Sequence, residues 1–596
     1  MKKQYYEYFL FFVFLFIINI LSTYAHTFHF NLENVFALKG FTILDTINHI
    51  LKPENFYNDF RGWSWSGLSS ITTYIYLYLH TIFHADIILL SNIFIFFESL
   101  SVTLAVSIFI RLLYPKTNLF FTLIPGLLFV MSMSFKSDLS NFSAPFFHGQ
   151  FYGYSDAFGL LALASTINKK FSTAMFLTFI TFCFHPIKGI IFGIILIPIF
   201  LINLKHLFVY HRIIVFGVCL ILSILFYFYL IKVNVPLLTM SNEEFNFHSR
   251  FFQHHWYPQD LGIFSYNYNR YILPFAILTI CGIVSCIRAN LGFEKKKYLL
   301  IILLSTLILS AIGIVNNYFQ IISSFIPLAF HRASLITLEL SVLMIIFLLW
   351  DNIKERNVIG ILLFISILSF LYTKPSVQGF VVAFIIPLFY ILFHLYGIIF
   401  EKNNAFSLPN YKFVNYVILV TILIYVFYLS MNWAETNKYG PEFHDEAAAY
   451  KEVQIWSKNN TKIDSVFMTD PCMSYGWRDF SERSSFGSLQ EWLKTGFIYN
   501  RDKKTFDEGI RRAKILGVNI DKYSGNPHKS FGELCKISRM NYYNSNMESI
   551  SEINAKYKVE YFIFKKTEVD KINEKLMIVF ENKFFTIVKI SNSKNI

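Results

Sequence analysis

The stretch "ASLITLELSVLMIIFLLW", residues 333–350, decides the fold of this chain. It is long and apolar enough to cross a lipid bilayer as a helix. Charged residues flank it, with "HR" at 331–332 and "DNIKER" at 351–356. The whole chain has a similar character, because 55% of its residues are hydrophobic, 15% are charged and the mean hydropathy is +0.46. This composition excludes the water-soluble class and indicates an integral membrane protein.

The apolar runs predict 13 spans. They are, roughly, residues 4–24, 86–110, 118–135, 156–167, 171–184, 189–204, 213–231, 271–287, 298–315, 333–350, 357–372, 378–399 and 413–431. The stretch 67–84 could also span, but we interpret it as helices at the membrane surface. Lys and Arg are then several times denser in the connectors on one side, which include "EKKK" at 294–297. By the positive-inside rule that side is cytoplasmic, as is the N-terminus, and the C-terminal region lies outside.

Two domains are expected: a transmembrane domain, 1–432, with a long first outer loop at 25–85, and an extracytoplasmic domain, 433–596. The second holds more than half of the charged residues. Helices are predicted in "EAAAYKEVQIWSKNN" and "TFDEGIRRAKILG", and strands in "DSVFMTD", "VEYFIFKK" and "KFFTIVKIS". The expected fold class is a multi-pass α-helical membrane protein with a C-terminal α/β or α+β domain.

Of the six cysteines, four lie in apolar runs and only Cys472 and Cys535 lie in the polar region. A disulfide between these two and a pair of free thiols both stay open. No CxxC spacing is present, so a structural zinc site is not expected. The net charge of +13 follows the Lys-rich composition and gives no reason to expect a nucleic-acid partner.

The first outer loop contains "KPENFYNDFRGWSWSG", residues 52–67. Asp59 lies there among five aromatic residues, with Glu54 and Arg61 nearby. A partly desolvated carboxylate has a raised pKa, which would make Asp59 a better base toward a hydroxyl group. The alternative is that this segment holds ordinary turn and helix-cap residues beside an interfacial aromatic belt.

Other polar residues are predicted at the same outer depth, where polar groups usually mark function. In "FCFHPIKG", residues 182–189, His185 and Lys188 end one span and start the next, and Arg332 starts a later span. These cations suit a phosphate group. A helix-capping histidine and an arginine that reaches lipid headgroups are the alternatives. Further candidates are His148, Asp156, His331, His254 and His255.

The loop at 240–260 mixes histidines and carboxylates, a mixture that can bind a divalent metal. His254 and His255 are sequence neighbours without HxxxH or HExxH spacing, so surface packing is favoured and no cofactor is assigned. Motifs of the GxSxG, Walker and GxGxxG types are absent from the sequence, which gives no support for chemistry on soluble nucleotides.

The chain resembles the C-type (GT-C) membrane glycosyltransferase superfamily, and most of all bacterial multi-pass proteins with an extracytoplasmic C-terminal domain. The matching pieces are "ENFYNDF", "FHPIKG", "HRASLITLEL" and the stretch "IWSKNNTKIDSVFMTDPCMSYGWRDFSERSSF". In the last of these the pattern is carried by Trp456, Pro471, Arg478, Phe480 and Arg483. Two departures are the absence of an acidic residue directly beside Asp59 and of the Trp-Trp-Asp signature of oligosaccharyltransferases, so oligosaccharyl transfer to protein is disfavoured.

The resemblance implies an inverting transferase that takes a sugar from a polyprenyl-phosphate donor to a glycan, lipid or protein acceptor outside the bacterial cytoplasmic membrane. It implies Asp59 as the base, and Arg332, His185 and Lys188 as the groups that hold the donor phosphate. Two other functions stay open. A surface-polysaccharide polymerase or ligase would use the 232–270 loop, and a transporter or flippase-like protein would use mid-span charges such as Glu98 and Glu339.

Overall fold

The structure of the chain is a computed structural model. It describes residues 2–28, 42–60, 69–131 except 116, 139, 151–232, 241–252, 256–257, 269–372 except 356, 388–395, scattered positions between 417 and 428, and 441–590 except 474–475, 496–502, 521–526, 545–546 and 569–575.

The chain forms two compact units, each built from three separate segments. The helical unit contains Met1–His26, Ser91–Phe226 and His255–Asn437. The sheet unit contains Thr27–Leu90, Tyr227–His254 and Lys438–Ile596. The last change of unit falls at Asn437/Lys438, and the first outer loop belongs to the sheet unit, so the division at 432/433 stays a prediction.

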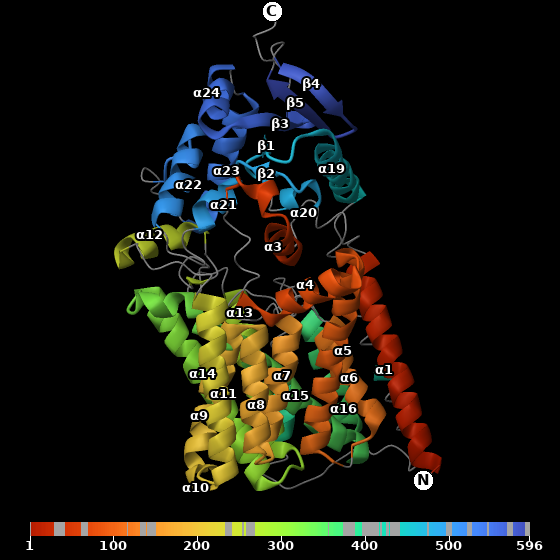
Figure 1. Cartoon of the computed structure of the whole chain (residues 1–596). Coiled ribbons are helices and arrows are strands. Elements are labelled where there is room, and N and C mark those ends of the chain that lie inside the picture. Colours follow the sequence, from red (N-terminus) through yellow and green to blue (C-terminus); the bar gives the residue numbers. More distant parts are fainter. Residues whose placement is uncertain are drawn as a thin grey trace, which may run out of the picture. The chain divides into compact units, whose positions relative to one another are not determined.

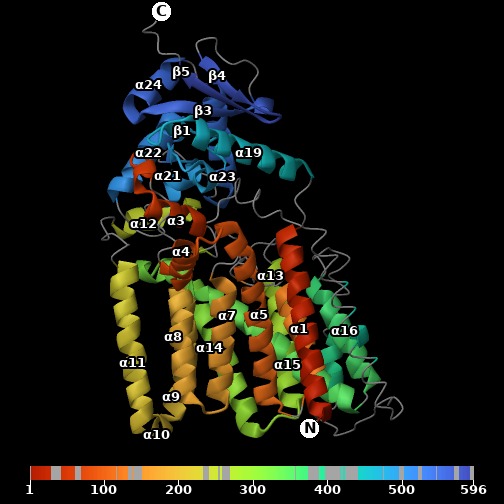
Figure 2. The ribbon, with the colours of Figure 1, turned by 45° about the vertical axis from the view of Figure 1, so that its right-hand side comes forward.

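The main helices of the helical unit are α1 (Lys2–Phe28), α5 (Ile87–Leu113), α6 (Leu119–Met131), α7 (Tyr152–Ile167), α8 (Phe171–Phe184), α9 (Pro186–Ile202), α11 (Tyr210–Phe226), α13 (Asn269–Arg288), α14 (Phe293–Phe319), α15 (Ala333–Glu355) and α16 (Val358–Tyr372). Helices α7, α8 and α9 pack on one another, and α8 also packs on α11 (Figures 1 and 2). Helix α15 packs on α13 and α14 and is buried along nearly all its length.

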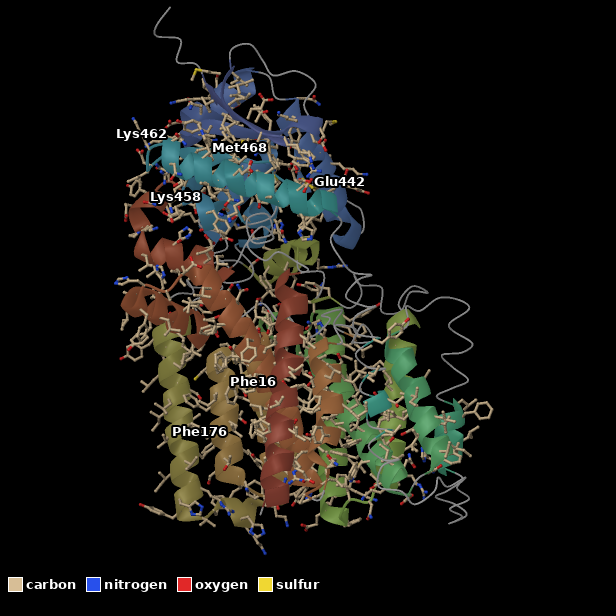
Figure 3. The ribbon with its side chains drawn as sticks, turned by 90° about the vertical axis from the view of Figure 1, so that its right-hand side faces the viewer. Phe16, Phe176, Glu442, Lys458, Lys462 and Met468 are labelled. Carbon is tan, nitrogen blue, oxygen red and sulfur yellow. A yellow bond between two sulfur atoms is a disulfide. The ribbon has the colours of Figure 1, made fainter. Side chains whose placement is uncertain are left out.

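Among the described residues, four helices are long and apolar enough to cross a membrane: Ile87–Leu113, Tyr210–Tyr229, Phe293–Phe319 and Ser323–Glu355. Five shorter apolar helices accompany them. Large apolar side chains also face outward, as Phe16 of α1 and Phe176 of α8 do with 47% and 51% of their surface exposed (Figure 3). An outward apolar surface of this kind suits lipid contact. Several apolar spans are thus present, and the number 13 stays a prediction.

The predicted spans at 378–399 and 413–431 lie largely outside the described residues. By contrast, the stretch 67–84 contains α4 (Ile71–Phe83), which has 13 residues and belongs to the sheet unit. A helix of this length extends for about 20 Å and is shorter than the ~30 Å hydrocarbon core of a bilayer. Its length agrees with our interpretation of this stretch as non-spanning.

The sheet unit contains a five-stranded mixed sheet with the order β2-β1-β3-β5-β4. The strands are β1 (Val466–Met468), β2 (Ser484–Ser485), β3 (Val559–Lys565), β4 (Leu576–Glu581) and β5 (Phe585–Ile590). Strand β1 pairs in parallel with β2 and β3, while β5 pairs antiparallel with β3 and β4. The three predicted strands are confirmed as β1, β3 and β5, and the sequence analysis missed β2 and β4.

Helix α19 (Pro441–Asn460) packs apolar side chains against this sheet. Its Tyr450 and Val453 are buried with Phe467 of β1, Ile563 of β3 and Ile587 of β5 in one hydrophobic core. Both helices predicted in this region are confirmed, as α19 and α22 (Lys503–Ile515). The remaining helices that surround the sheet are α20 (Trp477–Ser481), α21 (Leu489–Thr495), α23 (Pro527–Tyr543) and α24 (Met547–Tyr557).

Segments from earlier in the chain complete the sheet unit. They are α3 (Thr42–Leu51), η1 (Pro53–Phe56), α4 and α12 (Asn242–Phe252). Helix α3 packs on α20, and α12 packs on α21 and α23. This packing places the predicted outer-loop residues, including Asp59, against residues that lie more than 400 positions later in the sequence.

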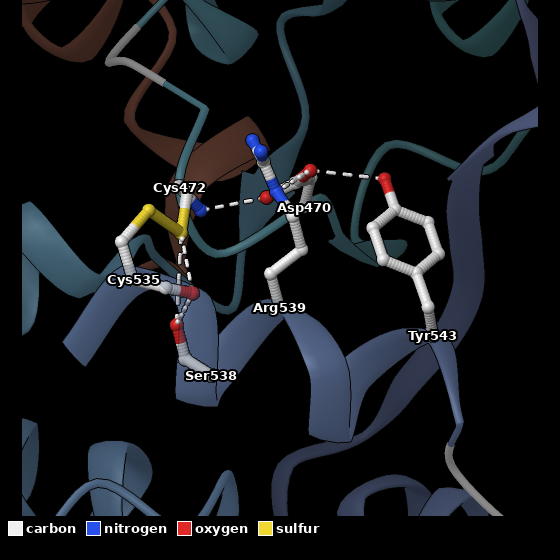
Figure 4. Close-up of a disulfide and its surroundings, with 6 residues drawn as sticks. All are labelled: Asp470, Cys472, Cys535, Ser538, Arg539 and Tyr543. Atoms are coloured by element: carbon white, nitrogen blue, oxygen red, sulfur yellow. Dashed lines mark hydrogen bonds and ion pairs between the residues drawn. A yellow bond between two sulfur atoms is a disulfide. The ribbon is translucent and has the colours of Figure 1, made fainter. Parts of the chain in front are cut away.

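A disulfide joins Cys472 to Cys535 of α23, two cysteines for which the sequence left the pairing open (Figure 4). Beside it, the Asp470 carboxylate accepts from the Cys472 amide at 2.8 Å and from the Tyr543 hydroxyl at 2.9 Å. Arg539 forms an ion pair with the same carboxylate at 2.9 Å.

Candidate functional site

Asp59 follows the short helix η1 in the sheet unit, and its side chain is fully buried. Three groups contact its carboxylate. Oδ2 accepts from Arg478 Nε at 2.8 Å and lies 3.2 Å from His49 Nε2, and Oδ1 accepts from the Ser485 amide at 2.7 Å. Both oxygens of the predicted base are therefore engaged by protein groups.

The prediction of a raised pKa for Asp59 is wrong. Burial by itself would raise the pKa of this carboxyl, but the Arg478 guanidinium and then His49 outweigh burial and lower the pKa to about 2. Desolvation by the aromatic neighbours is visible in the sequence near Asp59, whereas the cation comes from the distant α20 and is not.

His49 of α3 lies between two carboxylates, that of Asp45 on the same helix and that of Asp59 after η1. Its ring contacts Asp59 at 3.2 Å and Asp45 at 3.2 Å, and only 11% of its side chain is exposed. Burial by itself would lower the pKa of His49, but Asp45 and Asp59 outweigh burial and raise the pKa to about 10. His49 is therefore a cation near neutral pH, and the sequence analysis did not single it out.

The two other outer-loop candidates are Glu54 and Arg61. Glu54 is exposed in the first turn of η1, where a carboxylate suits the positive end of a helix. Arg61 lies outside the described residues.

A second cluster lies in the helical unit, where α7, α8 and α9 meet. Lys188 Nζ lies 2.6 Å from both carboxylate oxygens of Asp156, and it donates to the Tyr152 carbonyl oxygen at 3.4 Å. The side chains of Lys188 and Asp156 are 15% and 6% exposed. Removing two ions from water costs several kcal/mol for each, so an ion pair at this depth is poorly explained by stability alone.

His185 joins this cluster at the break between α8 and α9. Its Nδ1 accepts from the Lys188 amide at 3.3 Å and so caps the start of α9. An accepting Nδ1 leaves Nε2 as the nitrogen that carries the proton. The ring also lies against Phe151 and Tyr152, with centroids 5.3 and 5.1 Å apart. His185 therefore both caps α9 and belongs to the charged cluster.

Arg332 enters the cluster from η7 (Phe330–Arg332), the short helix before α15. Its positive charge acts on both His185 and Tyr152. The preceding His331 is fully buried against α14, where a Cβ on Gly313 would lie 2.2 Å from the His331 amide nitrogen. Glycine at 313 therefore allows the close approach that places η7.

The backbone just before η7 is strained. Ala329 has φ +47 and ψ +51, a left-handed conformation that costs a residue with a Cβ about 1–2 kcal/mol. Such conformations persist where surrounding contacts hold them, and they are frequent at functional sites.

Two residues of this second region were not predicted as site residues. The Tyr152 ring lies against His185 and Lys188, and Tyr152 interacts electrostatically with Asp156 and Arg332. The sequence signal for Tyr152 was the aromatic run before Asp156. Glu98 of α5 is fully buried and accepts from the Gly153 amide at 2.7 Å. This bond to the first turn of α7 gives Glu98 a role in helix packing, which is an alternative to its use as a mid-span charge by a transporter.

Of the predicted candidates, the structure brings together His185, Lys188, Asp156 and Arg332, with His331 next in sequence. Asp59 lies in the sheet unit. His148, His254 and His255 lie outside the described residues. Within the described part of the 240–260 loop, Glu244 pairs with Lys503 at 2.5 Å, and the His248 ring lies against Phe506. No group of three or more potential metal-ligating side chains occurs among the residues that the structure describes.

Fold and site together define a membrane protein of several apolar helices with an attached mixed-sheet unit and two buried charged clusters. No protein-family model matches the chain, and no curated protein matches it. The chain is similar to solved structures over more than nine-tenths of its length, at low sequence identity and with TM-scores under 0.5.

Three solved structures illustrate this similarity. The crystal structure of ArnT from Cupriavidus metallidurans bound to undecaprenyl phosphate has 10% identity and a TM-score of 0.46, with 98% of each chain covered. The apo Archaeoglobus fulgidus oligosaccharyltransferase has 11% identity and a TM-score of 0.41, covering 93% of this chain and 69% of that one. The archaeal oligosaccharyltransferase AglB from the same organism, in complex with an inhibitory peptide and a dolichol-phosphate, has 11% identity and a TM-score of 0.36, with 94% and 70% covered. At identities and TM-scores this low, the substrates and residue roles of these proteins cannot be assigned to this chain.

Proposed function

We propose that this chain is a membrane glycosyltransferase that moves a sugar from a polyprenyl-phosphate donor to an acceptor hydroxyl at the outer face of the bacterial cytoplasmic membrane. The observation that supports it is the buried cluster of Lys188, Arg332, His185 and Asp156 between apolar helices. A lipid-linked donor needs a charged site that its polyprenyl chain can reach through apolar surroundings. This cluster has that character.

The charge of the cluster suits a sugar phosphodiester. Lys188 and Arg332 bring two positive charges and Asp156 brings one negative charge. A phosphodiester carries one negative charge, so the excess positive charge would be neutralised on binding. Glu98 lies nearby, but the positive end of α7 offsets its charge through the Gly153 amide. The His185 Nε2 proton would supply a further hydrogen bond to a phosphate oxygen.

The proposed step is a single displacement with inversion. The acceptor oxygen bonds to the anomeric carbon, the bond from that carbon to the phosphate oxygen breaks, and the hydroxyl proton passes to a carboxylate. Negative charge then grows on the departing lipid phosphate. Lys188 and Arg332 would stabilise that charge more strongly in a dry site than in water.

Asp59 is the proposed proton acceptor, but its carboxylate must first become accessible to the acceptor hydroxyl. The Asp59 side chain is fully buried, so a hydroxyl can reach its carboxylate only after a neighbouring group moves, and the 3.2 Å contact to His49 is the longest of the three. Losing a cationic neighbour would also raise the pKa of Asp59 from about 2 and make it a stronger base. Asp156 is the alternative acceptor, because it already lies beside Lys188.

The sidedness rests on two independent features. The Lys and Arg bias of the connectors predicts a cytoplasmic N-terminus. The Cys472–Cys535 disulfide is suited to an oxidising compartment, which favours an extracytoplasmic sheet unit.

The test uses the purified full chain in vesicles made from a polar lipid extract of bacterial inner membranes, which brings its own pool of polyprenyl-linked sugars. The measurement is the amount of free undecaprenyl phosphate that forms, by mass spectrometry. We expect release by the wild-type chain, none by Asp59→Asn, and a higher donor requirement for Arg332→Gln. Arg212→Gln is the control, because Arg212 lies at the start of α11 and bonds the His206 carbonyl oxygen.

The outcomes separate the alternatives. Wild-type release that persists in Asp59→Asn but stops in Asp156→Asn would transfer the base role to Asp156. Undecaprenyl phosphate that binds but is never formed from the extract would overturn transfer in favour of a transport function. Equal losses in Arg332→Gln and Arg212→Gln would remove the specific phosphate role of Arg332.

A further inference from the structure

All three nitrogens of the Arg478 guanidinium on α20 donate hydrogen bonds, to the first outer loop and to Glu491. Nε donates to Asp59 Oδ2 at 2.8 Å and NH2 donates to the Phe60 carbonyl oxygen at 3.1 Å. NH1 donates to Glu491 Oε1 at 2.5 Å. The side chains of Arg478 and Glu491 are each only 3% exposed. Arg478 and Asp59 are separated by 419 positions in the sequence.

We propose that Arg478, held in place by Glu491, is a positioning residue for Asp59, so that the C-terminal part of the chain orients the carboxylate of the first outer loop. The inference rests on the proposed function in one respect, namely that Asp59 accepts the proton. It gives the C-terminal region a part in the reaction that does not require it to bind either substrate.

The contacts of Glu491 explain why Arg478 has one fixed orientation. Its Oε1 accepts from Arg478, and its Oε2 accepts from the Ser488 amide at 2.7 Å. The carboxylate is thus fixed to the first turn of α21, and it fixes the arginine in turn. An arginine with three planar contacts in different directions has little rotational freedom left.

The backbone beside Asp59 is held by the same part of the fold. The Phe60 amide donates to the Ser485 carbonyl oxygen at 3.1 Å, and the Ser485 amide donates to Asp59 Oδ1 at 2.7 Å. The Phe60 ring lies under the guanidinium of Arg512, 4.7 Å from its centroid. Strand β2 and α22 therefore fix the loop on the sides that Arg478 does not reach.

A neighbouring arginine shows what a purely structural role looks like. Arg483 is also buried, with 5% of its surface exposed. Its guanidinium donates to the Lys458 and Thr461 carbonyl oxygens, which close the C-terminal end of α19. Its side-chain hydrogen bonds among the described residues go to Lys458, Thr461 and Glu482 rather than to Asp59 or Phe60, so Arg483→Gln is a matched control.

Charged groups face Asp59 from four elements. They are His49 and Asp45 on α3, Arg478 on α20, Glu491 on α21 and Arg512 on α22. Without Arg478 the carboxylate would remain buried near Asp45 and Glu491, and both burial and these like charges favour proton binding. Loss of the arginine should therefore change both where Asp59 points and the pH at which it is ionised.

The first experiment measures hydrogen exchange of the peptide covering residues 53–60 in the purified full chain at neutral pH. We expect Arg478→Gln, Arg478→Lys and Glu491→Gln each to speed this exchange by roughly 10- to 100-fold, the range for losing a hydrogen bond to a charged group. Exchange in β3 should stay unchanged, which shows that the sheet is folded. Arg483→Gln should leave residues 53–60 as slow as in the wild type. Wild-type exchange in all three test variants would overturn the inference.

The second experiment measures release of undecaprenyl phosphate from the inner-membrane extract between pH 5 and 9. In Arg478→Gln the acid limb of the profile should move to higher pH, a change that loss of packing alone would not produce. Arg478→Lys keeps the charge but not the three contacts, so it should lower the rate while keeping the wild-type profile. An unchanged profile in Arg478→Gln overturns the inference. Absence of release by the wild type would instead overturn the proposed function, and the exchange experiment would still decide the positioning role.

Discussion

His49 gives the structure a built-in response to alkaline pH. Its ring is bonded to Asp59 and lies beside Asp45, and these carboxylates raise the pKa of His49 from 6.5 to about 10 against the opposing effect of burial. A group whose pKa is higher in the folded state than in the unfolded state stabilises the fold while it is protonated. We therefore expect the docked first loop to be most stable below pH 6.5 and to weaken as the pH rises through 10.

The size of the effect follows from the pKa. Each tenfold change in proton affinity is worth about 1.4 kcal/mol, so the rise at His49 corresponds to at most about 5 kcal/mol. The contribution is fully present below pH 6.5 and nearly absent above pH 10. Between these values the opening free energy of the loop should fall by up to about 1.4 kcal/mol for each pH unit.

Hydrogen exchange of residues 42–51 in the detergent-purified chain measures this local opening, after correction for the intrinsic pH dependence of exchange. The wild type should show the falling opening free energy from pH 6.5 to 10, and His49→Gln should show a flat one. His80→Gln is the matched control, because the His80 ring bonds the Ala85 carbonyl oxygen, and it should keep the wild-type slope. A flat wild-type profile, or a slope that survives in His49→Gln, would refute the reasoning.

Three further predictions concern stability. Gly313→Ala should lower the melting temperature, by an overpacking cost of about 1–3 kcal/mol at the His331 amide, whereas Gly217→Ala, with no atom within 4 Å of the added Cβ, should not lower it. Lys188→Met leaves its carboxylate partner buried and unpaired, so we expect a loss of about 3–5 kcal/mol in a thermal unfolding assay, and an unchanged midpoint would contradict the ion pair. Cys472→Ser opens a link across 63 positions and should cost about 2–5 kcal/mol; equal stability of the variant and the wild type under oxidising conditions would contradict the disulfide.

Local sequence patterns predicted the elements that carry a clear periodicity. Apolar runs indicated α5, α14 and α15, and the alternating stretches around Phe467 and Ile563 indicated β1 and β3. Strand β2 has only two residues, Ser484 and Ser485, and both are polar. A strand of that kind depends on its neighbour in the sheet, so the sequence contained no local signal for it.

The candidate sites were predictable in part for a similar reason. Span ends indicated His185, Lys188 and Arg332, because a polar residue beside an apolar run is visible in the sequence. The environment of Asp59 was not predictable, since its partner Arg478 comes from a distant segment and its pKa depends on that partner. A buried carboxylate does require a counter-charge, but sequence spacing alone does not say which arginine provides it.

The discontinuous make-up of the sheet unit has a consequence during synthesis. The segment around Asp59 leaves the ribosome long before α20, with 419 positions between the ionised partners. Contacts of such long range form slowly, because much chain must be ordered before they are made. The newly made first loop therefore has to wait, with its acid and its aromatic side chains unmatched, until nearly all membrane helices have been inserted. Premature termination before residue 478 would leave a protein that has the helices of the helical unit but whose Asp59 never acquires Arg478 as a counter-ion.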